Sequence, residues 1–345
     1  MNNTIVGVDL SKNCIQVCVV KQNKVISNRE MSSAQFTSWL AKTKPATVVF
    51  EACSTSNYWK QTATRLGHDA RLVSAKLVAK IRQNQKTDRN DALAVVQASQ
   101  LVNTRFINGK SFSQQELQSL IRIRELAVKQ KGALKNQIQA LLLEFNIRTH
   151  AQRGGLNTVI QQVLEDAENG FCLQFRQGLQ RAWGSYLSTV EAIADYDKLL
   201  GSTMEDHADC EKLTALEGVS VINAVNLCIQ LGCGEAGVFR TSQDASACIG
   251  LTPIQHSTGG KTRLGSIGKK VKNSSLRSYL VSGAMSVVNQ VSRREPKTAK
   301  EQWLKQLIER RGKRCAAVAL ANKTVRTAFA MLTHGTEYQP QPLKG

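Results

Sequence analysis

The stretch TIVGVDLSK, residues 4–12, runs through β-branched residues to an aspartate and decides how the chain begins to fold. It predicts a strand over residues 5–10. Similar short runs predict strands at residues 15–20, 24–26, 47–51 and 71–73, with Gln22 and Asn23 in a turn and Asn23 the better candidate for positive φ. Three close strands followed by alternating helices and strands predict an α/β sheet that opens with an antiparallel meander.

Four acids occupy informative positions in residues 1–92, where 14 Lys and Arg stand against six Asp and Glu. Asp9 and Glu51 each end an apolar strand, so both are expected at the carboxyl edge of the sheet. Asp88 and Asp91, three apart at the start of a predicted helix, share one face. Clustered carboxylates repel each other unless a cation lies among them, which predicts a Mg²⁺ or Mn²⁺ site for phosphodiester chemistry. The alternative is that Asp88 caps the helix, Asp91 lies in its first turn, and the other two are ordinary strand ends.

The charge of the chain favours a polyanionic partner. Its 345 residues carry a net charge of +20. Residues 240–330 alone hold 18 Lys and Arg against 4 Asp and Glu. The sequence has no apolar run that predicts a membrane span and no secretory leader, and its nine cysteines form no Cys-x-x-Cys pair, so we expect a cytoplasmic protein. Aromatic residues make up only 5%, which argues against an extended base-stacking platform.

The middle of the chain has heptad spacing in two runs. These are Leu134, Ile138, Leu141 and Phe145, then Leu179, Trp183, Tyr186, Val190 and Ile193. The spacing predicts two long helices that form a coiled coil, with each other or across an oligomer interface. Ordinary core helices have the same pattern.

Residues 250–265 form a basic segment with two adjacent glycines, Gly259 and Gly260. Glycines let a backbone approach phosphate closely, and Lys261 and Arg263 would neutralise its charge. A hydroxyl in this segment is a candidate nucleophile, and a simple turn or phosphate-contacting loop is the alternative. Upstream, residues 213–220 resemble the hairpin of a helix-hairpin-helix element, but Glu217 would repel phosphate, so packing is an equal alternative.

Three motifs together resemble one enzyme family. The motifs VGVDLSK (residues 6–12), VFEA (49–52) and KTDRNDA (86–92) are similar to the Asp-Glu-Asp-Asp tetrad of RuvC-like domains in bacterial insertion-sequence transposases related to the Piv invertase. The resemblance implies a ribonuclease H fold in which Asp9, Glu51, Asp88 and Asp91 are catalytic metal ligands. The motifs STGGKTRLGSI (257–267) and LRSYL (276–280) resemble the signature of the family's second catalytic domain. There Ser257 would form a phosphoserine bond with DNA, with Thr258 and then Ser266 as alternative assignments.

The resemblance also implies an architecture and partners. It divides the chain into a RuvC-like domain (1–108), coiled-coil oligomerisation helices (109–208) and a mainly helical basic serine domain (209–345) with a flexible tail from Gly335. It implies a transposase or site-specific recombinase, dimeric to tetrameric, with a composite site on double-stranded donor and target DNA. A structured bridge RNA would pair with both DNAs, and the protein would associate with the nucleoid when bound to DNA.

The residues expected to contact nucleic acid are Lys12, Lys86, Arg89, Gly259, Gly260, Lys261, Arg263, Lys269, Lys270, Lys272 and Arg277. Two other functions compete with recombination. One is a RuvC-like nuclease or Holliday-junction resolvase in which metal-activated water attacks DNA. The other is a non-catalytic nucleic-acid-binding protein.

Overall fold

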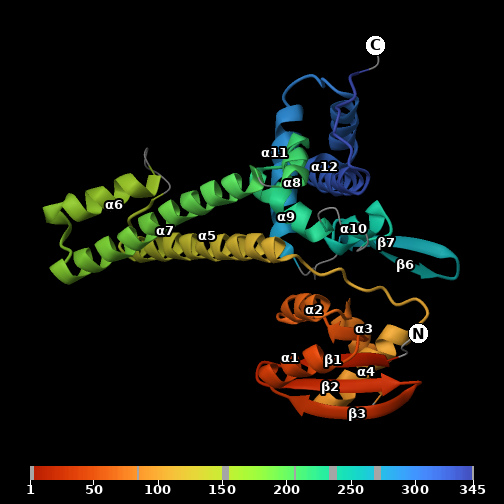
Figure 1. Ribbon diagram of the computed structural model, residues 1–345. Helices are drawn as coiled ribbons and strands as arrows, with labels where there is room; N and C mark the ends of the chain where they lie inside the picture. The colour runs from red at the N-terminus through yellow and green to blue at the C-terminus, as the bar shows by residue number, and fades with distance from the viewer. Residues whose placement is uncertain are drawn as a thin grey trace. The chain divides into compact units, whose positions relative to one another are not determined.

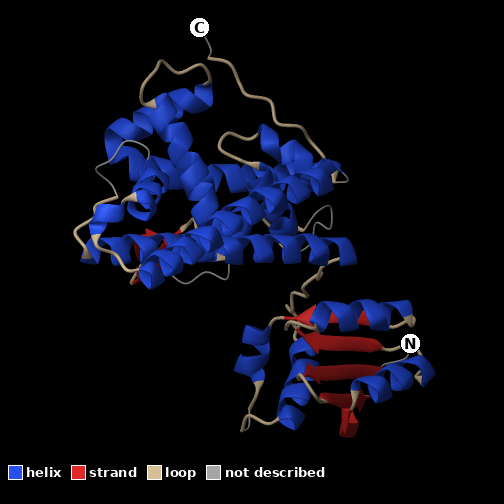
Figure 2. Cartoon of the chain, turned by 90° about the vertical axis from the view of Figure 1, so that its left-hand side faces the viewer, coloured by secondary structure: helices blue, strands red, loops and turns tan. Residues whose placement is uncertain are grey.

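The structure is a computed structural model that describes residues 4–83, 85–149, 155–205, 207–232, 239–267 and 273–343. The chain forms two compact units, coloured by secondary structure in Figure 2. The first holds Met1–Gln115 with Ile229–Ala245 and Leu332–Gly335, and the second holds Glu116–Cys228, Ser246–Met331 and Thr336–Gly345. Within the described ranges, no helix combines the length and the apolar character needed to cross a bilayer.

The first unit is built on a five-stranded sheet with the strand order β3-β2-β1-β4-β5. The strands are β1 (Thr4–Leu10), β2 (Ile15–Lys21), β3 (Lys24–Met31), β4 (Thr47–Glu51) and β5 (Asp69–Val73). Strands β1, β2 and β3 form an antiparallel meander, and β4 and β5 run parallel to β1. The predicted α/β sheet with a leading meander is confirmed, and this mixed sheet is consistent with a RuvC-like domain.

Strand β3 is longer than the sequence predicts. The prediction ends at residue 26, but Asn28, Arg29 and Glu30 continue the main-chain pairing with β2 as far as Met31. Because β3 is an edge strand, its polar side chains remain in solvent without loss of the pairing. In the preceding turn both Gln22 (φ 48°) and Asn23 (φ 60°) are left-handed, whereas the sequence favours Asn23 over Gln22 for this conformation.

Helices cover both faces of this sheet (Figure 1). On one face, α1 (Ser33–Lys42) and α2 (Ser56–Arg65) pack in a core with Val6, Val8 and Phe50. On the other, α3 (Ala75–Ile81) and α4 (Asp88–Gln100) bury Val49 and Val73. Successive side chains of a strand point to opposite faces, so Asp9 and Glu51 lie on the face that α3 and α4 cover.

Two helices of 33 residues, α5 (Phe112–Glu144) and α7 (Leu173–Glu205), account for the long middle of the chain. They run antiparallel, because Arg124 forms an ion pair with Asp197 while Ile138 shares an apolar cluster with Leu179. Helix α6 (Gly155–Glu165) contributes Val159, Ile160 and Val163 to the same cluster. These two helices therefore pack against each other within one chain and share a core with α6.

The remaining elements are mainly helical and include one β-hairpin. They are α8 (Ala208–Lys212), the 3₁₀ turns η1 (Ala167–Asn169) and η2 (Leu213–Ala215), α9 (Val221–Leu231), α10 (Ser242–Cys248), β6 (Pro253–Thr258), β7 (Lys261–Ile267), α11 (Ser274–Val291) and α12 (Ala299–His334). Helix α12 consists of two helices that meet at Gly312, whose φ of 77° and ψ of 166° are not helical.

The turn at Gly218 packs directly on α11. A Cβ at Gly218 would lie 2.7 Å from the main chain of Gly283, and Gly218 has a φ of 75°. Glycine is thus required there by both space and conformation. Of the two roles that the sequence allows for this turn, packing is the one for which the structure gives contacts.

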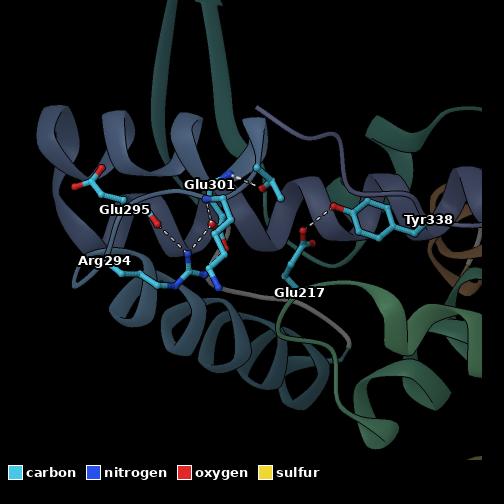
Figure 3. Close-up of polar contacts among 7 residues, drawn as sticks. Glu217, Arg294, Glu295, Glu301 and Tyr338 are labelled. Atoms are coloured by element: carbon cyan, nitrogen blue, oxygen red, sulfur yellow. Dashed lines mark hydrogen bonds and ion pairs between the residues drawn. The ribbon is translucent and has the colours of Figure 1, made fainter. Parts of the chain in front are cut away.

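Glu217 anchors the end of the chain, as Figure 3 shows. Its carboxylate accepts a hydrogen bond from Tyr338 Oη at 2.7 Å and from Lys300 Nζ at 2.5 Å. Burial alone would raise the pKa of Glu217, but these two hydrogen bonds lower it. The tail, for which the sequence predicts flexibility from Gly335, therefore makes specific contacts at Tyr338. Lys300 also compensates the charge that was expected to repel phosphate.

Candidate active site

Strand register brings two of the predicted acids together. Strands β1 and β4 are parallel neighbours in which Val8 pairs with Phe50. Asp9 and Glu51 each follow those residues, so they emerge side by side at the carboxyl edge of the two strands. The sequence pattern of a strand ending in an acid therefore predicts their common location.

Helix α4 supplies the other two acids. Thr87 is its N-cap, and the Thr87 side chain accepts a hydrogen bond from the Asn90 N–H at 3.3 Å. The alternative in which Asp88 caps the helix is therefore wrong. Asp88 and Asp91 both lie in the first turn, where carboxylates interact favourably with the helix dipole.

Gly7 fixes how closely α4 approaches β1. A Cβ at Gly7 would collide with the carbonyl oxygen of Ala92 and would lie 2.6 Å from Val96 Cγ2. A side chain at this position would push the first turn of α4, and with it Asp91, away from Asp9. Gly7 thus belongs to the machinery that assembles the four acids.

Gly7→Ala is expected to destabilise the protein by roughly 1–3 kcal/mol, because its methyl group overpacks the contact between β1 and α4. Denaturant unfolding measures this as a lower midpoint with an unchanged slope. The matched control is Gly184→Ala in α7, where no heavy atom lies within 4 Å of the added Cβ. Equal midpoints for Gly7→Ala and the wild type would contradict the close approach.

The four acids line one cavity of about 520 Å³ at this edge of the sheet. Its other lining residues are Ala75, Lys76, Val78, Ala79, Arg82 and Lys86. Burial, followed by the charges of Asp91 and Asp88, raises the pKa of Asp9 to about 6. Burial and the charge of Asp9 likewise raise the pKa of Glu51. The cavity therefore concentrates negative charge that is only partly compensated.

Two cations that enter this cavity balance part of the charge. Arg82 donates from Nη1 to Asp91 Oδ1 at 2.7 Å, and the Asp91 side chain is only 10% exposed. Lys86 lowers the pKa of both Asp9 and Glu51. Lys86 is among the predicted contacts, but Arg82 is not, since it precedes the Lys-Thr-Asp motif and matches no spacing rule. Lys12 and Arg89 are exposed and are not among the residues that line the cavity.

The donor set fits a hard divalent cation. All four groups are carboxylates, the oxygen ligands that Mg²⁺ and Mn²⁺ prefer, and their mutual repulsion would be relieved by a cation. Among the described residues, no three His, Cys, Asp or Glu side chains are gathered closely enough to hold a metal ion. The acids thus share a cavity without converging on a single point, and Asp91 is bound by Arg82 instead.

The predicted serine lies in a different kind of structure from the expected loop. Ser257 is part of β6 and pairs with Thr262 of β7, two residues before a tight turn. Both turn glycines, Gly259 (φ 56°) and Gly260 (φ 76°), are left-handed, as a two-residue hairpin turn requires. Every residue of β6 is exposed, so the Ser257 hydroxyl is accessible to a large substrate.

The two faces of this hairpin differ in chemistry. Ser257 shares a face with Gln255, whose Nε2 lies 3.4 Å from Ser257 Oγ, and with its partner Thr262. The cross-strand pairs of His256 with Arg263 and of Thr258 with Lys261 fall on the opposite face. Thr258, Lys261 and Arg263 therefore do not share the face of Ser257, and only Gln255 hydrogen-bonds the serine side chain among the described residues.

The other predicted contacts are spread over the C-terminal part. Ser266 is an exposed residue of β7, and Arg277 is half-buried in the first turns of α11. Lys269, Lys270 and Lys272 lie outside the described residues. The four acids are thus brought into one cavity, whereas the basic residues occupy several elements.

Comparisons with known proteins match both ends of the chain. Residues 6–147 match a family model described as transposase, for the DEDD domain of IS110 elements. Residues 210–301 match one described as transposase of the IS116/IS110/IS902 family. The chain is 35% identical to the transposase for insertion sequence element IS1111A of Coxiella burnetii, over 97% of this chain and 91% of that protein. It is 34% identical to a probable family 20 transposase of Pseudomonas aeruginosa, over 99% of this chain and 100% of the relative.

Proposed function

The chain belongs to the IS116/IS110/IS902 family of transposases, and from this premise we propose that it exchanges DNA strands through a phosphoserine intermediate formed by Ser257. The observation that carries the proposal is the shared cavity of Asp9, Glu51, Asp88 and Asp91 in a chain that also presents an exposed serine on a hairpin. Each group has a separate task in phosphoryl transfer.

The chemical step is a transesterification. Ser257 Oγ attacks the scissile phosphorus, a bond from phosphorus to Oγ forms, and the bond to one bridging oxygen breaks. The serine proton leaves to solvent, and the departing strand end takes up a proton. A hydroxyl of a second strand then attacks the phosphoserine and releases Ser257, so the number of phosphodiester bonds is unchanged and no external energy is needed.

Asp9, Glu51, Asp88 and Asp91 would hold Mg²⁺ or Mn²⁺. When bound, the ion supplies positive charge that stabilises the phosphate and the leaving oxygen. To hold the ion, Asp9 would have to be ionised, and Asp91 would use the oxygen that Arg82 does not contact or would exchange Arg82 for the ion. Lys86 at the rim would attract the DNA phosphates.

We propose that the acids and the serine at one phosphodiester come from different subunits of a dimer or tetramer. Large apolar side chains remain exposed along α5 and α7, and they offer a surface for a second copy. They are Ile123, Leu126, Leu187, Val190 and Leu199. Removal of such side chains from water at an interface is favourable.

Donor and target would be double-stranded DNA, held by the basic residues named above. We propose a structured bridge RNA as the component that selects them, because the resemblance to the insertion-sequence recombinases implies one. A strongly basic chain that is poor in aromatic residues is compatible with recognition through paired nucleic acid. The expected result is a discrete, structured RNA that copurifies with the protein from cells containing the element. Recovery of only heterogeneous cellular RNA would contradict the guided part of the proposal and leave the chemistry untouched.

The test of the chemistry is a covalent adduct. Purified protein, DNA carrying a donor junction, target DNA and Mg²⁺ are incubated and then denatured. We expect protein linked to DNA through phosphoserine. Cleaved DNA without linked protein would instead favour water as the nucleophile, as in a RuvC-like nuclease.

A further inference from the structure

A group of cations outside the acid cavity lies where α11 and α12 meet. These are Arg293 just after α11 and Arg310, Arg311, Lys313 and Arg314 at the break in α12, and we call them the basic corner. All five are exposed. Residues 302–345 lie beyond the range of either matching family model.

Within the described part of the chain, the cations of the basic corner have no acidic partner, whereas nearby cations do. In the same segment Arg294 pairs with Glu301 at 2.5 Å and Lys305 pairs with Glu295 at 2.7 Å; Figure 3 labels Arg294 and Glu301. No residue of the basic corner forms a salt bridge within the described part of the chain, and the adjacent Glu309 forms none either. Like charges so close repel each other, and an anionic partner would remove this cost.

The backbone at Gly312 separates the two helices of α12 in the middle of these cations. Its φ of 77° and ψ of 166° are accessible almost only to glycine. Two cations precede Gly312 and two follow it, so all four lie on one short segment that contains the break.

A cavity extends the basic corner along α11. Lys313 Nζ donates to Asn289 Oδ1 at 3.3 Å, and Asn289 lines a cavity of about 620 Å³ together with Ser286, Gln290 and Arg293. Hydroxyl, amide and guanidinium groups are the side-chain donors that commonly bind phosphate oxygens in DNA complexes. The cavity and the basic corner therefore form one continuous surface rich in hydrogen-bond donors and positive charge.

We propose that this surface binds the phosphate backbone of duplex DNA away from the scissile linkage. DNA is favoured because the family acts on DNA, and because adjacent cations on either side of the break can contact successive phosphates. Arg293 and the amides in the cavity would hold the strand that continues along α11. The proposal rests on the proposed function only for the identity of the polyanion, and requires neither Ser257 nor a metal ion.

The test measures DNA affinity as a function of salt, by fluorescence anisotropy of a labelled duplex with the full-length protein in EDTA. Each phosphate contact contributes about 0.9 to the slope of log K against log salt. The triple variant Arg310→Gln, Arg311→Gln and Arg314→Gln is expected to reduce the magnitude of that slope by about 2 to 3. The corresponding triple lysine variant should keep the wild-type slope.

The matched control is the triple variant Lys24→Gln, Lys42→Gln and Lys44→Gln, which removes the same charge. These lysines are exposed on the first unit, at the sheet edge opposite Asp9 and Glu51. Its slope should stay close to that of the wild type. If both glutamine variants change the slope equally, the basic corner has no specific role. A slope that falls for structured RNA but not for duplex DNA would overturn the assignment to DNA. Because this assay measures binding alone, either result leaves the phosphoserine chemistry untouched.

Discussion

Ser257→Ala is expected to abolish the covalent protein–DNA adduct and to lower strand exchange by at least about a thousandfold. The variant lacks the only atom at position 257 that can bond to phosphorus, and catalytic nucleophiles are not replaced by neighbours without a large loss in rate. Folding should not change, because Ser257 lies on an exposed strand and its side chain hydrogen-bonds only Gln255 among the described residues. Denaturing gels of the reaction with labelled DNA measure both effects.

Two neighbouring hydroxyls provide matched controls. Thr258→Val and Ser266→Ala remove hydroxyls from the same hairpin, and each variant should still form the adduct. Thr258 points to the face opposite Ser257, so it cannot take the same place at a phosphate without a twist of the hairpin. An adduct that survives in Ser257→Ala but not in Thr258→Val would move the nucleophile by one residue.

Asp9→Asn is expected to have opposite effects on activity and stability. Adduct formation should fall by at least about a thousandfold, because the variant loses a central carboxylate of the proposed metal site. Stability without divalent metal should rise at pH 8, because Asp9 is then ionised in a partly buried cavity beside Asp88 and Asp91. Substitution of a residue whose only role is structural would lower adduct formation and stability together.

The pH dependence follows from the raised pKa of Asp9. In the unfolded chain Asp9 ionises near 3.8, and in the folded chain near 6. Ionisation of Asp9 therefore destabilises the folded state by its full amount above pH 6 and not at all below about pH 4. Asp9→Asn should raise the free energy of unfolding by about 1–2 kcal/mol at pH 8, discounted from the ~3 kcal/mol of the full shift for partial solvation. The difference should vanish near pH 4.

Thermal or denaturant unfolding with and without Mg²⁺ checks this prediction. Mg²⁺ should stabilise the wild type, since it binds the folded state, and should have little effect on Asp9→Asn. The control is Asp195→Asn, which removes an exposed acid of α7 whose lysine partner lies 3.5 Å away. A lower stability of Asp9→Asn at pH 8 would contradict the repulsion that we infer in the cavity.

Much of the first unit could be predicted from the sequence, because its signals are local. The meander follows from three β-branched runs separated by short polar turns, and Asp9 and Glu51 fall at one edge because parallel strands end together. The extension of β3 could not be predicted in this way. Its polar residues Asn28 to Glu30 look like a loop, and only the pairing with β2 makes them a strand.

The site was harder to predict where it depends on contacts distant in sequence. The contact of Arg82 with Asp91 depends on how α3 and α4 pack, and no motif records it. The division of the hairpin into a serine face and a basic face depends on strand register, whereas the sequence gives only a glycine-rich basic run. The anchoring of Tyr338 by Glu217 joins residues that are 121 positions apart.

The most direct test of the central claim is peptide mapping by mass spectrometry of the adduct formed on donor-junction DNA. It compares the wild type in Mg²⁺, the wild type in EDTA and Asp9→Asn in Mg²⁺. We predict a nucleotide phosphate on Ser257 in the first sample and none in the other two. A phosphoserine at Ser257 that forms equally in all three, or cleaved DNA with no modified serine in the first, would contradict joint action of the acids and the serine.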